Sequence, residues 1–310
     1  MTDSDSIYYY TSLENGYNNL ISETLYFSDI TELNDTAEVS YISDELQKVV
    51  GNYAVDDNYV RSKVIWIIEK LVIPTVNIMF KLKKLESYRK EESYPYLKSL
   101  AETLGDSKAY VFCCSKKKDD LSMWKFYGGN VGGVVIEFDR KVIEKSFNKK
   151  NDESNDKNKE NDKNDEVSID DVKYCEETLE CNLINLVDNL VQNISQVDWQ
   201  ESDKLNQELE PVIKTFWDFL MEEVIFSKNK NWQHEEEIRI FHKGVDEFLE
   251  DSIINGRKRS FLKLKFKLES IKGIKLGPLS TQEQMEYFEE LIKEKNLQIK
   301  LEKSAIGYRG

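Results

Sequence analysis

The chain has 310 residues, of which 33% are charged and 40% hydrophobic, and its formal net charge is −15. This length suits one large domain or two ordinary ones, and this composition is typical of a soluble globular protein with a real core. A chain this acidic is not drawn to nucleic acid by its overall field, so any such binding needs a local basic patch.

The cysteines and the apolar segments predict a cytoplasmic protein that does not enter the membrane. The polar, acidic start of the chain at Met1 to Ser6 is unlike a signal peptide. The most apolar segment, 64–80, is interrupted by Pro74, and its longest uncharged run is too short to cross a bilayer. The four cysteines, which lack disulfide or zinc-ligand spacing, are Cys113, Cys114, Cys175 and Cys181.

The first half of the chain predicts short strands rich in aromatic and β-branched residues, separated by helices. Asp119 is the predicted N-cap of a short helix that Gly128 ends. Strands are predicted over 7–11, 25–28, 110–115 and 134–138, helices over 59–90 (broken at Pro74) and 121–127, and a helix or loop over 12–22.

Residues 148–166 are almost entirely Asn, Asp, Lys, Glu and Ser, and we expect them to be a disordered insertion. Two amphipathic helices follow within 179–226 and predict a lid or flank. Ser280 to Glu283 forms a capping-box signature for a helix through Lys295. Further strands are predicted over 236–241, 261–267, 271–276 and 297–301. The whole chain, 1–310, is thus expected to be a single α+β domain with a mixed, mostly antiparallel sheet flanked by helices.

The segment from Asn231 to Ile240 carries the densest cluster of chemical groups. Because side chains alternate along a strand, we expect Glu235, Glu237 and Arg239 to share one face. Two carboxylates and a guanidinium this close must pair or hold a ligand, so we place the candidate site here. A solvated charged face of a surface strand is the simpler alternative.

Several motifs, in this order and spacing, make the chain resemble the bacterial family known as domain of unknown function 2971. The resemblance covers most of the chain, roughly Tyr8 to Tyr308, without the polar insertion. The residues that carry it are Tyr8 to Tyr10, Leu25 to Ser28, Asn34, Asp35, Phe112 to Ser115, Met123, Trp124, Tyr127, Asn130, Gly133, Ile136 to Phe138, Phe226, Lys228, Trp232, Glu235, Glu237, Arg239, Ile274 to Gly277 and Tyr308. The resemblance implies that the gene for this protein lies among bacterial defence and mobile-element genes. It also implies a protein partner in a defence system.

The layout is also similar to that of the ADP-ribosyltransferase superfamily, in which two early strands line NAD and a late strand supplies a Glu-x-Glu motif. That similarity implies NAD as the substrate and a protein or nucleic-acid acceptor. It makes Glu237 the residue that stabilises the oxocarbenium charge and Glu235 the acceptor-side residue. The residues expected to line the cofactor are Tyr10, Tyr26, Ser28 and Arg239.

Two other functions fit the sequence. In the first, the protein is a non-enzymatic sensor or interaction protein, and Glu235, Glu237 and Arg239 form an internal ion-pair network. In the second, Glu137, Asp139 and Lys141 alternate along a strand edge as in a metal-dependent nuclease. We expect Trp124 and Tyr127 to be core residues of a short helix, and no metal site is predicted.

Overall fold

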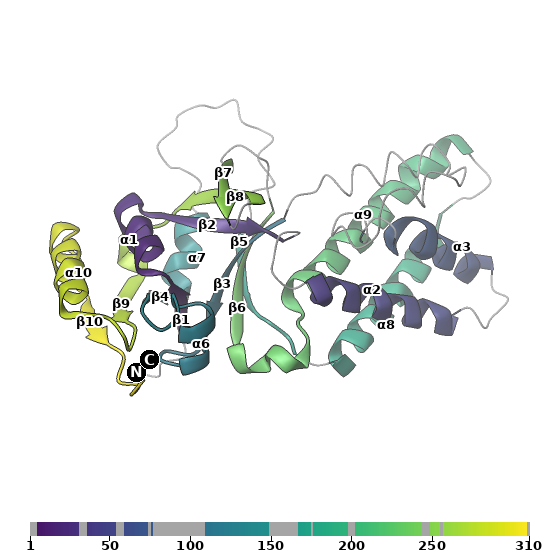
Figure 1. The fold of residues 1–310 in the computed structure, drawn as a ribbon. Coiled ribbons are helices and arrows are strands. Elements are labelled where there is room, and N and C mark those ends of the chain that lie inside the picture. Colours follow the sequence, from purple (N-terminus) through teal and green to yellow (C-terminus); the bar gives the residue numbers. More distant parts are fainter. Residues whose placement is uncertain are drawn as a thin grey trace, which may run out of the picture. The chain divides into compact units, whose positions relative to one another are not determined.

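The computed structural model describes residues 5–30, 36–53, 59–73, 76, 109–148, 167–174, 176–197, 202–243, 249–254 and 257–308. The chain clusters into two compact units (Figure 1). Unit 1 contains 1–29, 109–172 and 232–310, and unit 2 contains 30–108 and 173–231. The predicted lid or flank at 179–226 therefore belongs to unit 2. The predicted disordered insertion lies outside the described residues, except for Asn148, which ends a helix.

Unit 1 is built on one sheet, and the predicted α+β class with a mixed, mostly antiparallel sheet is confirmed. Among the described strands, β9 and β10 pair in parallel and the other pairings are antiparallel. The strands are β1 (Ser6–Thr11), β2 (Thr24–Asp29), β3 (Ala109–Ser115), β4 (Val134–Asp139), β5 (Val167–Asp171), β6 (Glu237–Lys243), β7 (Leu249–Ile254), β8 (Arg257–Lys265), β9 (Ile271–Leu276) and β10 (Lys300–Lys303).

The sheet branches at β3. One edge of β3 pairs with β6 along its whole length, from Ala109 to Ser115. Its other edge is shared, because β2 pairs at Tyr110 and Val111 while β1 pairs at Ser115. The series β1-β4-β9-β10 and the series β2-β8-β7 therefore leave the same edge of one strand. This branching places the middle of β1 next to the end of β3 and the start of β6.

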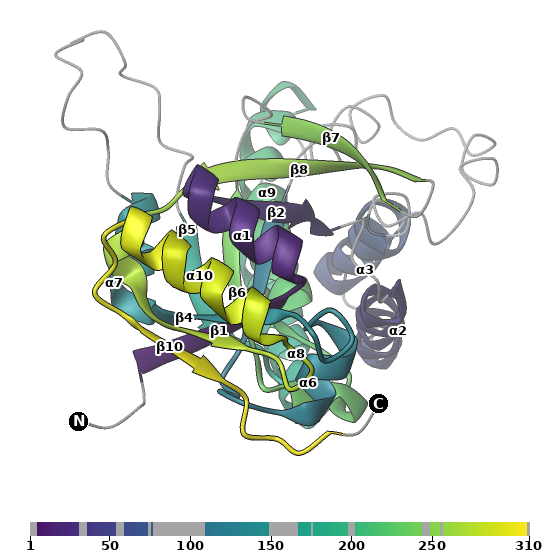
Figure 2. The same ribbon diagram turned by 60° about the vertical axis from the view of Figure 1, so that its left-hand side comes forward.

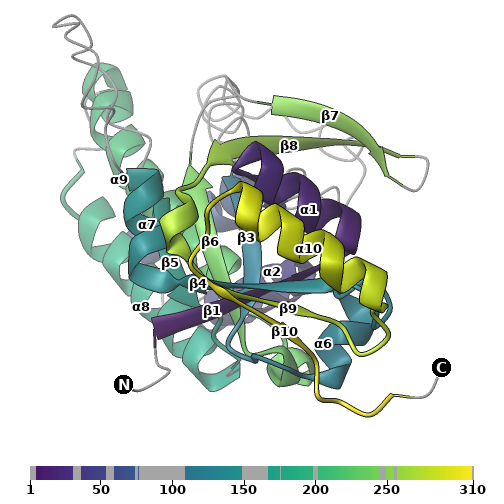
Figure 3. The same ribbon diagram turned by 90° about the vertical axis from the view of Figure 1, so that its left-hand side faces the viewer.

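Helices cover both faces of this sheet. Those of unit 1 are α1 (Leu13–Ser22), α6 (Leu121–Phe126), α7 (Arg140–Asn148) and α10 (Gln282–Glu294). On one face α1 and α10 lie side by side, and α7 adjoins β4 and β5 (Figures 2 and 3). They enclose the main core, which contains Phe27, Phe112, Ile136 and Ile240. On the opposite face, α6 and the C-terminal segment cover a smaller cluster around Trp124.

Two helix caps differ from their predictions by one residue. Asp120, not Asp119, caps α6, because its Oδ1 accepts from the backbone N–H groups of Ser122 and Met123. Thr281, not Ser280, caps α10 and forms a capping box with Gln284. In both cases two polar residues precede the helix, and residue type alone does not choose between neighbours that can both cap.

Unit 2 is helical. It contains α2 (Thr36–Tyr53), α3 (Tyr59–Ile67) with a π-helical turn at Ile68–Val72, α8 (Glu176–Ile194) and α9 (Ser202–Phe226). Helix α8 packs against α2, α3 and α9. Pro211 lies inside α9. Among the helices described in this unit, none is long and apolar enough to span a membrane, and the same holds for those of unit 1.

Candidate functional site

The start of β6 holds a buried ion pair between Glu237 and Arg239. The two residues are two positions apart on a strand and therefore project from the same face. Arg239 Nε donates to Glu237 Oε1 at 2.8 Å, and Nη2 donates to Oε2 at 3.1 Å. Their side chains are only 2% and 7% exposed. This two-pronged contact fixes the orientation of the carboxylate and offsets its charge, which a buried position requires.

Glu235 does not belong to that strand. It ends a 3-10 turn at Lys230–Glu235, and Glu236 then takes a left-handed conformation with φ 45°. The predicted shared face is therefore wrong for Glu235, because the turn at Glu236 breaks the alternation on which the prediction depends. The Glu235 side chain is buried and accepts a hydrogen bond of 2.5 Å from the hydroxyl of Tyr127. Its carbonyl oxygen accepts one of 2.6 Å from Ser115 Oγ.

This hydrogen bond joins two of the motifs that carry the family resemblance. Tyr127 follows α6 in the segment that contains Met123 and Trp124, and Glu235 belongs to the charged segment more than 100 residues later. The prediction of core packing is confirmed for Trp124, which is fully buried, and is wrong for Tyr127, which is 40% exposed. Tyr127 and Ser115 are thus site residues that sequence reasoning missed, although both lie within the family motifs.

The turn after Tyr127 is strained. Gly129, Asn130 and Val131 have φ values of 56°, 52° and 68°. Glycine accepts this conformation freely, whereas a β-branched residue such as Val131 rarely does. Gly133 lets the turn approach β1, because a Cβ there would lie 2.1 Å from the carbonyl oxygen of Thr11. Strain of this kind persists only where the surroundings enforce it, and it clusters at functional sites.

The residues predicted to line NAD share one face of the sheet with the ion pair. Ile7, Leu25, Phe27 and Ile238 point into the main core, so their neighbours in sequence point to the opposite face. That face receives Tyr10, Tyr26, Ser28, Glu237 and Arg239. Ser115 pairs with both Tyr8 and Glu237 in the register, which places these three residues in one row across the sheet.

The contacts of Tyr10, Tyr26 and Ser28 place them at different points on this face. Tyr10 is packed beneath α6, where its ring meets Trp124 at 5.0 Å and its hydroxyl donates to the carbonyl of Lys117. Tyr26 lies farther along the face, where its ring contacts Phe261 and Lys263. Ser28 is in register with Val111. The structure therefore brings Glu237 and Arg239 into contact, and it gives Tyr10 a packing role.

Asp119 connects three segments beside α6. Its carboxylate accepts from Trp124 Nε1 and Ser304 Oγ, both at 2.7 Å, and from Lys275 Nζ at 3.1 Å. Burial acts to raise the pKa of this carboxyl, but these hydrogen bonds and the charge of Lys275 prevail and hold the pKa below its usual value. Asp119 thus stabilises the contact between α6, β9 and the C-terminal segment.

Cys114 lies behind the ion pair as an unreactive thiol. It is buried, and burial together with the negative charge of Glu237 raises the pKa of its thiol strongly. A thiol that stays protonated is a poor nucleophile. Cysteine chemistry at this position is therefore not favoured.

The nuclease hypothesis finds little support in the geometry. Asp139 caps α7, accepting from the N–H groups of Lys141 and Val142, and Lys141 pairs with Asp5 at 2.7 Å. Among the residues that the structure describes, no group of three or more His, Cys, Asp or Glu side chains could hold a metal ion. Glu137 instead lines a cavity over β4 and β9.

Comparison with known proteins gives one match. Residues 123–240 match the family model described as "Protein of unknown function (DUF2971)". No curated protein and no solved structure matches the chain, so the similarity to ADP-ribosyltransferases stays a prediction. The matched segment runs from Met123 to Ile240 and contains both motifs that the Tyr127–Glu235 hydrogen bond joins. The predicted resemblance to this family is confirmed over this segment.

Proposed function

We propose that the protein consumes NAD, breaking the bond between nicotinamide and ribose, and that Glu237 is the residue at which this happens. One observation carries the proposal. Glu237 is a buried carboxylate whose orientation Arg239 fixes, on the sheet face that also receives Tyr26 and Ser28. An oriented carboxylate in a water-poor position stabilises a developing positive charge more strongly than one in water.

The reaction requires few groups. The C1′–N bond breaks with its electron pair leaving on neutral nicotinamide, and the ribose gains oxocarbenium character next to Glu237. An acceptor oxygen or nitrogen, or water, then adds to C1′, and its proton passes to the Glu235 carboxylate. Tyr127 is half exposed and hydrogen-bonded to that carboxylate, so it links Glu235 to the surface. Arg239, one of the residues expected to line the cofactor, would hold Glu237 in place through its two hydrogen bonds.

We expect Glu237→Gln to lower nicotinamide release from NAD by about 10²–10³-fold, the usual cost of losing one electrostatic stabiliser. Glu236→Gln is the matched control, because Glu236 is the exposed neighbour and the chemical change is the same. Both variants should be compared with the wild type by released nicotinamide, with the melting temperature recorded in parallel. Equal release by the folded Glu237→Gln variant and the wild type would exclude the assigned role.

A different observation favours a second candidate, a non-enzymatic sensor or interaction protein of a bacterial defence system. Both oxygens of Glu237 accept from Arg239, and Glu235 accepts from Tyr127, so the motif also fits a purely structural clamp. This candidate predicts that Glu237→Gln lowers the melting temperature while the wild type releases no nicotinamide. The pair of measurements above therefore distinguishes the two functions.

A further inference from the structure

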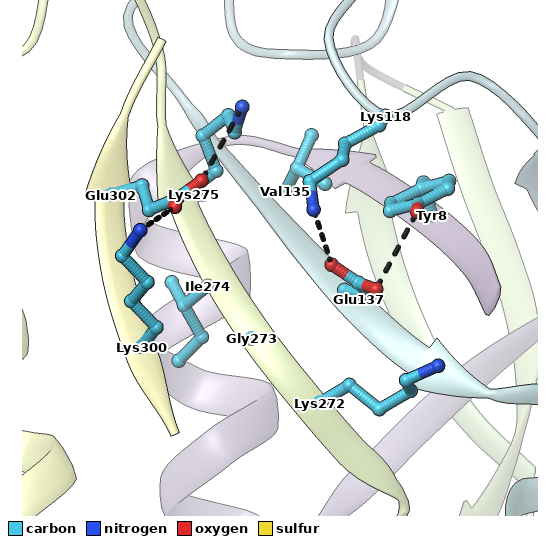
Figure 4. A pocket seen from close by; sticks show the side chains of 10 residues that line it. All are labelled: Tyr8, Lys118, Val135, Glu137, Lys272, Gly273, Ile274, Lys275, Lys300 and Glu302. Atoms are coloured by element: carbon cyan, nitrogen blue, oxygen red, sulfur yellow. Dashed lines mark hydrogen bonds and ion pairs between the residues drawn. The ribbon is translucent and has the colours of Figure 1, made fainter. Parts of the chain in front are cut away.

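A cavity of about 220 Å³ lies over β1, β4, β9 and β10 in unit 1 (Figure 4). Six charged side chains line it: Lys118, Lys272, Lys275, Lys300, Glu137 and Glu302. The lining charges sum to +2, in a chain whose net charge is −15. The overall field of so acidic a protein repels anions from most of its surface. The positive charge that lines this cavity attracts a small anion locally.

One wall of the cavity is held by ion pairs. Lys275 contacts Asp119 at 3.1 Å and Glu302 at 3.6 Å, and its side chain is only 13% exposed. Lys300 also pairs with Glu302. Figure 4 shows these two lysines and Glu302 together at one side of the cavity. Their charges are largely offset, so these side chains form the wall of the cavity but contribute little to attracting an anion.

Two other lysines stand on either side of Glu137. Lys118 Nζ lies 3.4 Å from Glu137 Oε2, which is longer than the roughly 2.7–2.9 Å of a strong charged hydrogen bond. Lys272 Nζ donates to a neutral acceptor, Ser6 Oγ, at 2.7 Å. Neither of these contacts is a close ion pair, so both ammonium groups can turn to an anion by exchanging a long ion pair or a hydrogen bond to a neutral hydroxyl. Figure 4 shows them on opposite sides of the carboxylate.

Glu137 restricts which anions the cavity can bind. Its Oε1 accepts from Ser6 Oγ at 2.8 Å, and the hydroxyl of Tyr8 lies 3.5 Å away. Its side chain is 14% exposed, so it faces whatever enters. A carboxylate beside a bound anion repels it unless the ligand also offers a hydrogen-bond donor to that carboxylate. The ligand must therefore combine an anionic group with a nearby hydroxyl or similar donor.

We propose that this cavity binds a small sugar phosphate, with Lys118 and Lys272 contacting the phosphate and Glu137 accepting from a sugar hydroxyl. The volume is below the roughly 300–1,000 Å³ of sites for drug-sized ligands, which suits a ligand of this size. The pocket lining contains none of Glu235, Glu237, Arg239 and Tyr127. Absence of sugar-phosphate binding and absence of NAD cleavage are therefore separate results.

Gly273 forms part of the lining and provides a steric test. A Cβ there would lie 3.5 Å from the carbonyl oxygen of Lys300 and 3.6 Å from Glu137 Oε2, which are ordinary contacts. Gly273→Ala should therefore keep the fold and most of the binding. Gly273→Leu should fill the cavity and abolish binding.

Isothermal titration calorimetry of the full chain with ribose 5-phosphate, pyrophosphate and inorganic phosphate tests the assignment. We expect ribose 5-phosphate to bind most tightly, and Lys118→Ala and Lys272→Ala each to weaken it by about tenfold, the loss of one charged hydrogen bond. Lys267→Ala is the matched control. Lys267 is 45% exposed and pairs with Glu269, as Lys118 is 47% exposed and pairs with Glu137.

Three results would overturn the proposal. They are no heat of binding with any of the three probes, affinity unchanged in both lysine variants, and equal loss in the Lys267→Ala control. Pyrophosphate or inorganic phosphate binding more tightly than ribose 5-phosphate would overturn the role given to Glu137. Circular dichroism of each variant separates lost binding from lost folding.

Discussion

Arg239→Met should lower the free energy of unfolding by about 3–5 kcal/mol, the usual effect of removing one partner of a buried ion pair. Methionine keeps an unbranched side chain but leaves the Glu237 carboxylate buried without the two donors of Arg239. The carboxylate must then stay charged in a poorly solvated position or become protonated, and both cost free energy. Equilibrium urea denaturation, followed by circular dichroism, measures the change.

The double variant Glu237→Leu with Arg239→Met is the control for this experiment. It removes both charges and leaves apolar groups of similar volume, which is often neutral or stabilising for a buried pair. We therefore expect the double variant to recover most of the lost stability. A loss below about 1 kcal/mol in the single variant would mean that water reaches the pair and that Glu237 is not desolvated.

Trp124→Ala is expected to destabilise unit 1 by about 3–5 kcal/mol, as large aromatic truncations in cores do. Trp124 is fully buried, its ring packs edge-on against Tyr10, and its Nε1 donates to Asp119 at 2.7 Å. The truncation creates a cavity and also removes a donor from a carboxylate that two other side chains share. Thermal and urea unfolding of the variant would measure the loss.

Two further variants separate the effect of the lost hydrogen bond from the effect of the lost buried ring. Trp124→Phe keeps an aromatic ring but removes the donor, so we expect about 1–3 kcal/mol from the hydrogen bond and the reduced volume. Phe126→Ala changes an aromatic residue of the same helix that is 68% exposed, and it should stay within about 0.5 kcal/mol of the wild type. Equal losses for Trp124→Ala and Phe126→Ala would contradict the placement of Trp124 in the core.

The sequence predicts the strands of unit 1 best where they are short runs rich in aromatic and β-branched residues. The strands around Tyr8, Phe27, Phe112 and Ile136 lie within one or two residues of their predicted bounds. Three of these strands are buried on most of both faces, so they read as short, nearly continuous runs of aromatic and aliphatic residues. Helix α2 (Thr36–Tyr53) was missed, although Ile42, Leu46, Val49 and Val50 recur at helical spacing and are buried.

The candidate site was predicted in part, and its errors have local physical causes. The pairing of Glu237 with Arg239 follows from their spacing on a strand. The position of Glu235 does not, because the left-handed residue Glu236 ends the regular pattern one residue before the strand. The contacts of Tyr127 and Ser115 with Glu235 join segments far apart in sequence. Such contacts depend on the tertiary fold, which a single sequence does not supply.

The most direct test of the assignment of Glu237 is a crystal structure of the protein soaked with NAD. We expect the nicotinamide ribose to lie on the sheet face of Tyr26 and Ser28, within about 3.5 Å of the Glu237 carboxylate, with Arg239 still donating to that carboxylate. NAD bound at another place on the molecule, with Glu237 closed off by Arg239 and in contact with protein alone, would contradict the account.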